Sequence, residues 1–185
     1  MTTTFNFNDG NGLVPAHKHP NGSGWVADTA TVADTAYVGP DARVYGNTWV
    51  SGDAWVFGNA QVYGNAQVSD TARVYNNAKV FDNAQVYGNS RVYGNAMVYG
   101  NVQVYGNARV YGKARVYENV RVYGNAMVYG DAWVSGDAWV FGNVSKVYDD
   151  TCNRLSGRTE KFDTNEDIFI EMNDKRYKLV EVEKS

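Results

Sequence analysis

The sequence is poor in the residues that crosslinks and most catalysis require: it holds one cysteine, two histidines and three prolines in 185 residues. With Cys152 alone, no intrachain disulfide can form, which favours a reducing compartment. No apolar run approaches membrane-spanning length, and the first residues lack the basic and apolar segments of a signal peptide. We therefore expect a soluble, cytoplasmic protein without a membrane partner.

The scarcity of histidine also limits metal chemistry. His17 and His19 form the only cluster of metal ligands, and an H-x-H pair needs a third or fourth ligand that the neighbouring sequence does not supply. They are weak metal candidates, and we expect them to lie in a capping loop. Cys152 stands beside no histidine, so we interpret it as an ordinary side chain rather than a nucleophile. The sequence predicts neither a metal nor a cofactor.

Overall charge disfavours two kinds of surface. A net charge of −3 argues against a surface that coats a polyanion, and equally against a carboxylate-rich mimic of nucleic acid.

What the chain does contain is a repeat. A valine recurs every six residues from Val26 to Val140, through twenty consecutive hexads without an insertion or deletion. In the commonest unit, A-x-V-Y-G-N, alternation along a strand places Ala and Val on one face. Gly and Asn then form a corner, because both tolerate the positive φ that most residues avoid. A fixed short period of this kind predicts a solenoid with a narrow core of valine and alanine.

The order of residues 104–109, V-Y-G-N-A-R, resembles the hexapeptide repeat of left-handed parallel β-helix proteins. That family includes many acyltransferases, γ-class carbonic anhydrases and uncharacterised repeat proteins of bacteria and phages. The resemblance implies three hexads per triangular coil, about seven coils, a left-handed winding and a homotrimer. We therefore predict an all-β, single-stranded parallel β-helix over 25–145, preceded by an N-terminal cap over 1–24.

The period fails after Val144, which marks the end of the predicted β-helix. Two apolar-rich runs then flank a turn at residues 173–175, the pattern of a β-hairpin. We predict that residues 146–185 form a C-terminal cap or hairpin extension, which covers the last coil or clasps a neighbouring subunit.

The repeats carry the scaffold of the resembled family without its chemistry. Hexapeptide acyltransferases generally use a histidine base, and γ-class carbonic anhydrases hold zinc with three histidines. Residues 26–140 contain no histidine and no interrupting loop, so no catalytic residue is predicted. An acyltransferase remains a second alternative, which would need His17 or His19 to reach a neighbouring subunit.

The outer surface offers the remaining functional signal, because residues eighteen apart should stack into ladders. The aromatic side chains stacked on one face would expose more apolar area than the largest apolar patch of a typical monomer. This favours a non-catalytic scaffold or protein-binding module that forms a homotrimer. The alternative is a surface for a small anionic ligand, a nucleotide or nucleic acid, with arginines pairing with anions and tyrosines stacking on bases or sugars. The residues of this candidate site are Arg73, Tyr75, Arg91, Tyr93, Arg109 and Tyr111.

One internal duplication favours a spacer over a pocket. The segment 49–59 recurs at 133–143, a shift of fourteen hexads. Fourteen is not a multiple of three, so the two copies should lie on different faces of a triangular coil.

Overall fold

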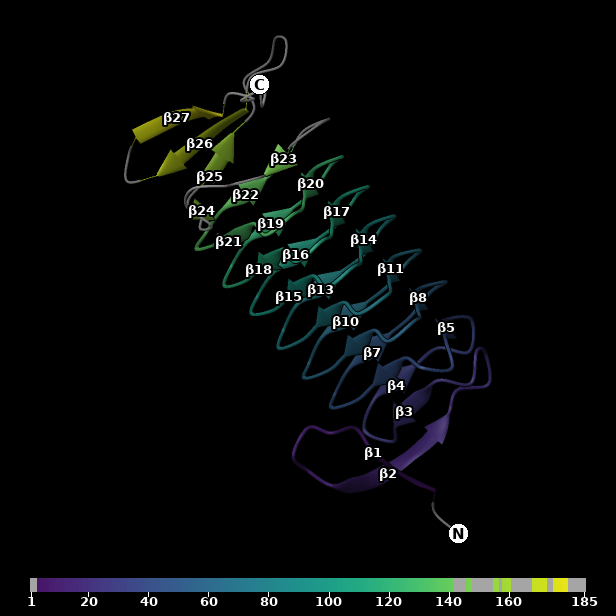
Figure 1. The fold of residues 1–185 in the computed structure, drawn as a ribbon. Coiled ribbons are helices and arrows are strands. Elements are labelled where there is room, and N and C mark those ends of the chain that lie inside the picture. The colour runs from purple at the N-terminus through teal and green to yellow at the C-terminus, as the bar shows by residue number, and fades with distance from the viewer. Residues whose placement is uncertain are drawn as a thin grey trace.

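The computed structural model describes residues 3–141 and, beyond them, only the strands β23 (Lys146–Val147), β24 (Leu155–Ser156), β25 (Arg158–Glu160), β26 (Ile168–Met172) and β27 (Lys175–Leu179). The described residues form strands, turns and bends and include no helix. Short strands stack into a long column of parallel coils (Figure 1). The predicted parallel β-solenoid is confirmed.

Every hexad contributes one short strand, and successive strands join three different sheets. Sheet I contains β3 (Trp25–Ala27), β6 (Arg43–Val44), β9 (Gln61–Val62), β12 (Lys79–Val80), β15 (Met97–Val98), β18 (Arg115–Val116) and β21 (Trp133–Ser135). Sheet II contains β4 (Thr31–Val32), β7 (Trp49–Val50), β10 (Gln67–Val68), β13 (Gln85–Val86), β16 (Gln103–Val104), β19 (Arg121–Val122) and β22 (Trp139–Val140). Sheet III contains β5 (Tyr37–Val38), β8 (Trp55–Val56), β11 (Arg73–Val74), β14 (Arg91–Val92), β17 (Arg109–Val110) and β20 (Met127–Val128).

Three strands therefore make one coil, and residues eighteen apart are paired, as Val62 is with Val80. Twenty strands, β3 to β22, at three per coil give six complete coils and two strands of a seventh. The two copies of the duplicated segment begin on different faces, since Trp49 lies in sheet II and Trp133 in sheet I. The left-handed winding that the resemblance implies stays a prediction.

The core is a single column of valine and alanine. Every lead valine from Val38 to Val134 is fully buried. Two polar residues, Thr48 and Ser90, replace inward alanines, and their hydroxyls donate to backbone carbonyls. The Oγ of Ser90 lies 2.8 Å from the Tyr87 oxygen and 3.2 Å from the Val104 oxygen. These bonds remove most of the cost of burying a hydroxyl among apolar side chains.

The corners differ in one respect from the sequence interpretation. From Gly46 to Gly136, only the first corner position adopts a positive φ, whether it holds glycine or another residue, as at Asp70 (59°) and Glu118 (66°). The second corner position, usually asparagine, does not, so the conformational role that we predicted for it is wrong. Its side chain instead bonds to the same position in the next coil.

The N-terminal end of the column is extended by antiparallel strands. Strand β1 (Thr4–Asn6) pairs with β2 (Leu13–Lys18), which pairs with β3 at the first coil. Phe7 is buried, and its ring stacks on that of Tyr45 with a centroid distance of 4.8 Å. The parallel pattern of the solenoid is thus closed at this end by a hairpin with its own aromatic cluster.

The C-terminal strands show where the period breaks. Strand β23 pairs with β20 at an offset of nineteen residues, Val128 to Val147, and β24 pairs with β21 at an offset of twenty-one, Val134 to Leu155. Strands β26 and β27 form the predicted antiparallel hairpin, which pairs with β25 in a separate sheet at this end (Figure 1). Cys152 lies outside the described residues, and a capping or clasping role of the hairpin stays a prediction.

Candidate functional site

Sheet III carries an unbroken row of three arginines on its outer face. Arg73, Arg91 and Arg109 precede the buried valines of three successive strands and are direct partners across the parallel ladder. All three side chains are exposed. On the same ladder, Trp55 precedes the three arginines and Met127 follows them. The predicted arginine ladder is therefore present, and we call it the arginine row.

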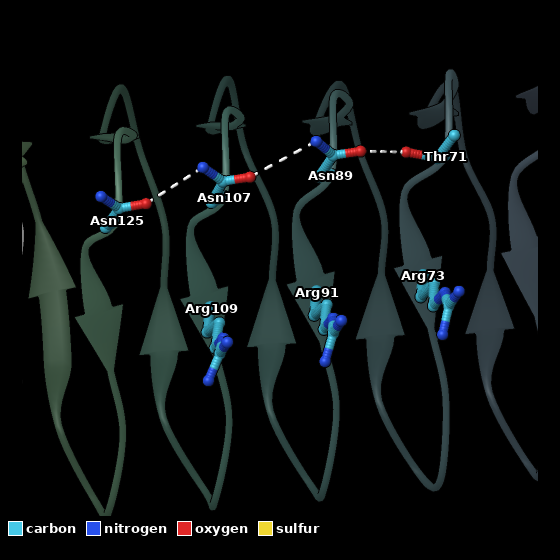
Figure 2. Close-up of a pocket in the computed structure, with 7 residues that line it drawn as sticks. All are labelled: Thr71, Arg73, Asn89, Arg91, Asn107, Arg109 and Asn125. Carbon is cyan, nitrogen blue, oxygen red and sulfur yellow. Dashed lines mark hydrogen bonds between the residues drawn. The ribbon is translucent and has the colours of Figure 1, made fainter.

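A second row runs beside the first at the preceding corner. Thr71, Asn89, Asn107 and Asn125 lie two residues before the row of Arg73, Arg91, Arg109 and Met127, and the single residue between each pair faces the core. Figure 2 shows the two rows running in parallel across the same coils, the arginines on the strands and the corner row on the turns. Together, the corner row and the three arginines line an open groove of about 590 Å³ along the column.

Amide hydrogen bonds hold the corner row in place. Nδ2 of Asn89 donates to Oδ1 of Asn107 at 3.4 Å, and Nδ2 of Asn107 donates to Oδ1 of Asn125 at 3.0 Å, while the Thr71 hydroxyl donates to Asn89 (Figure 2). An amide has two N–H donors and two oxygen lone pairs. The ladder therefore leaves a second donor and a second lone pair on Asn89 and on Asn107.

Charge is segregated between corners and faces over residues 25–141. The acidic residues all occupy corners: Asp28, Asp34, Asp41, Asp53, Asp70, Asp82, Glu118, Asp131 and Asp137. The basic residues, apart from Lys113 at a corner, all occupy the strand position before a valine: Arg43, Arg73, Lys79, Arg91, Arg109, Arg115 and Arg121. Each face is therefore positive and each edge is negative or neutral.

The arginine row has no carboxylate partner among residues 3–141. Within that range the ion pairs are His17 with Asp28 and Lys113 with Asp131. Arg73 lies over the Trp55 ring, with 5.6 Å from Cζ to the centroid, a cation–π contact at the N-terminal end of the row. The row therefore concentrates positive charge that no carboxylate in this part of the chain neutralises.

The third row, of tyrosines, flanks the arginines on their other side. The rings of Tyr75, Tyr93 and Tyr111 stack at centroid distances of 4.9 and 4.8 Å with interplanar angles of 3° and 1°. Burial raises the pKa of the Tyr93 phenol, as do its two phenol neighbours, while Arg109 and Arg91 act in the opposite direction. Both faces of the Tyr93 ring are covered, so only its edge and hydroxyl are open to a ligand.

Stacking on a base or a sugar, the role that the sequence suggested for these tyrosines, needs an open ring face. Tyr93 has none, because Tyr75 and Tyr111 occupy its two faces. The same geometry recurs on sheets I and II, where rows that include Tyr63 with Phe81 and Tyr87 with Tyr105 stack in parallel. The tyrosine rows are thus primarily stacked with themselves.

The two histidines lie away from the arginine row, on the N-terminal segment that pairs with sheet I. His17 Nδ1 is 2.8 Å from Asp28 Oδ1, whereas His19 is buried and its Nε2 lies 3.0 Å from the Ala36 oxygen. His19 therefore joins the N-terminal segment to the first coil. Among residues 3–141, no group of three or more His, Cys, Asp or Glu side chains could hold a metal ion.

The asparagines of the corner row are the part of the groove that sequence reasoning missed. Its signal was available, because asparagine recurs at eighteen-residue spacing at 89, 107 and 125, beside the arginines at 91 and 109. A role in backbone conformation alone, which the sequence suggests for asparagine at a corner, does not include this contribution to the groove.

Stacked parallel coils, a valine and alanine column and outward side-chain rows define a β-solenoid repeat protein. A family model described as the YdcK beta solenoid repeat matches residues 90–104, 102–118 and 120–136, which include Arg91 and Arg109. No curated protein and no solved structure gives a significant match. The match is to a β-solenoid repeat, and the relationship to hexapeptide acyltransferases stays a prediction.

In the described part of the chain, no helix has the length and hydrophobicity needed to span a bilayer.

Proposed function

We propose that the protein is a rigid, non-catalytic scaffold that binds an anionic ligand along the arginine row. The observation that supports this is three exposed guanidinium groups on successive coils without a carboxylate partner among residues 3–141. Like charges separated by one strand spacing repel by about 1 kcal/mol per pair in water. An anion in the groove replaces that repulsion with charge-assisted hydrogen bonds.

Rigidity supports the same proposal. The backbone N–H of Arg91 donates to the Ala108 oxygen at 2.9 Å, and that of Tyr93 donates to the Val110 oxygen at 2.9 Å. Each arginine is thus fixed at Cα by bonds to the next coil. Because the backbone of the row is already ordered, binding a ligand costs little conformational entropy of the backbone.

The test replaces Arg73, Arg91 and Arg109 together by glutamine. Sheet II already carries a glutamine row on the same coils, at Gln67, Gln85 and Gln103, so the fold accommodates the change. We expect the affinity for tripolyphosphate at low salt, measured by titration calorimetry, to fall at least 10-fold. The dependence of the affinity on salt concentration should weaken as well.

A matched variant separates the row from overall charge. Replacing Arg43, Arg115 and Arg121 by glutamine removes the same charge from positions that do not form a row, because they are spread over sheets I and II. This variant should keep most of the affinity. Equal losses in both variants, or no loss in the first, would contradict the proposal.

A second candidate function is self-association as a homotrimer, or binding of a different protein through the same surface. It is favoured by exposed indoles, since Trp49 is 56% and Trp55 43% exposed on sheets II and III. Exposed large aromatics are typical of protein interfaces. Light scattering on the purified protein should give a mass of three times 20.5 kDa. A mass of one chain would rule the trimer out and leave these indoles for another partner.

A further inference from the structure

We infer that the ligand of the groove is a linear acidic polysaccharide, with one uronate residue per coil, lying parallel to the column. This rests on the proposed function, which requires only that anions bind at the arginine row. It adds the chemical class of the anion and the direction in which the anion lies along the column.

The first argument is the repeat of the groove. Each coil presents the same pair of groups to the groove, one guanidinium and one neutral corner side chain, as at Arg91 and Asn89. The tyrosine rings of the same coils repeat at 4.8 to 4.9 Å, the spacing of strands in a sheet. A residue of an extended 1,4-linked polysaccharide advances by close to one strand spacing, so successive sugars lie at the height of successive coils.

The second argument is chemical. A uronate residue carries one carboxylate and neighbouring hydroxyls, and each coil offers one cation beside neutral donors and acceptors. The guanidinium suits the carboxylate, since it can donate two parallel N–H bonds. Asn89 and Asn107 each retain one N–H and one lone pair outside their ladder, which suits sugar hydroxyls that both donate and accept.

Nucleic acid is the less suitable occupant. Proteins that bind single strands rely on aromatic faces on which bases stack. The Tyr93 ring lies between Tyr75 and Tyr111 with both faces covered. A compact anion such as inorganic phosphate engages one or two guanidinium groups and leaves the rest of the row unneutralised.

The ends of the groove set the length of the ligand. Asp53 occupies the corner row one coil before Thr71, and Trp55 occupies the strand row one coil before Arg73. At the other end Met127 follows Arg109. The cationic part thus covers three coils, so a trisaccharide fills it and further residues extend beyond the row.

The experiment titrates β-1,4-linked oligouronates of one to five residues into the protein. We expect affinity to rise up to the trisaccharide, to at least 10-fold above the monosaccharide, and then to level off. The fully methyl-esterified trisaccharide, which lacks the charges, should bind at least 10-fold more weakly. The triple glutamine variant at Arg73, Arg91 and Arg109 should lose the preference for length, and the matched variant at Arg43, Arg115 and Arg121 should retain it.

Other outcomes separate this inference from the proposed function. If tripolyphosphate or an oligothymidylate binds through the arginine row and oligouronates do not, or bind no better than the monosaccharide, the polysaccharide is wrong while anion binding stands. If the triple glutamine variant binds every anion as the unmodified protein does, both fall.

Discussion

At the scale of the residue, the inward positions determine both stability and tolerance to change. Val92 is fully buried in the central column, and its methyl groups have no contact with solvent. Ser90, two residues earlier, occupies a position that holds alanine in most other coils. The two residues therefore allow a paired test of the core.

Val92→Ala should destabilise the protein by about 2 kcal/mol, because two buried carbons are removed and a cavity remains. Ser90→Ala should change stability by about 0.5 kcal/mol or less, since both the hydroxyl and its need for partners disappear together. Thermal unfolding of the two variants checks this. A larger loss for Ser90→Ala than for Val92→Ala would show that the buried hydroxyl bonds, not the valine column, hold the central coils.

Titration of one buried phenol provides a second prediction at this scale. Burial, with the neighbouring phenol of Tyr63 and the carboxylate of Asp9 adding to it, raises the pKa of Tyr45 from about 10 to about 12. Because the folded protein holds the neutral form, this contribution to stability is complete below pH 10 and is lost as pH rises towards 12. The urea midpoint should therefore fall across that interval.

Tyr45→Phe should reduce that fall, and phenylalanine already occupies the same row at Phe81. Phenolate absorbance of the folded protein should lose the component that titrates near pH 12 in the same variant. An unchanged alkaline component would assign it to another tyrosine.

At the scale of the element, one hexad is too short to be a stable unit, and its neighbours in the adjacent coils supply the missing contacts. Strand β14 holds only Arg91 and Val92, yet it pairs with β11 and β17. The tyrosine that follows each strand adds a ring contact in both directions. The side-chain rows are therefore part of what holds the coils together.

Tyr93→Ala should cost about 1–3 kcal/mol, because it removes two ring contacts worth about 0.5–1.5 kcal/mol each. Tyr93→Phe keeps both ring contacts, so its stability should stay close to that of the unmodified protein. Phenylalanine already stacks in this row, since the Phe57 ring stacks on that of Tyr75. Denaturant unfolding followed by tyrosine fluorescence measures both. Equal destabilisation by the two changes would mean that the hydroxyl matters more than the stack.

The elements also show how far sequence reasoning reached. An unbroken six-residue period sets the register, so the pairing of Arg73 with Arg91 follows from spacing alone once three hexads make a coil. The orientation of side chains does not follow from spacing. Whether Asn89 serves its own backbone or bonds to Asn107, and whether Tyr93 shows a face or an edge, depends on neighbours in three dimensions. Of the residues that line the groove, the sequence therefore predicts only the arginines.

At the scale of the whole molecule, the solenoid is close to one-dimensional. Each coil of the column pairs with the coil before and the coil after, and the hairpin of β1 and β2 contacts the column only at its first coils. Local damage should remain local in such an arrangement.

Phe7→Ala tests this, because Phe7 is buried with its ring against those of Phe5 and Tyr45. Amide hydrogen exchange should accelerate in β1 and β2, whose packing depends on that ring, and should stay unchanged in β14 to β20. Faster exchange along the entire column would mean that the coils unfold as one cooperative unit.

The constant eighteen-residue register has a consequence for how such a chain can change its length. Duplication of one whole coil, for example residues 92–109, inserts a rung that matches those above and below it, and adds a fourth arginine to the row. Gain or loss of a single hexad instead turns everything downstream onto the adjacent face, which would divide the arginines between two sides. Growth in steps of three hexads is thus the only kind that lengthens the groove without dismantling it.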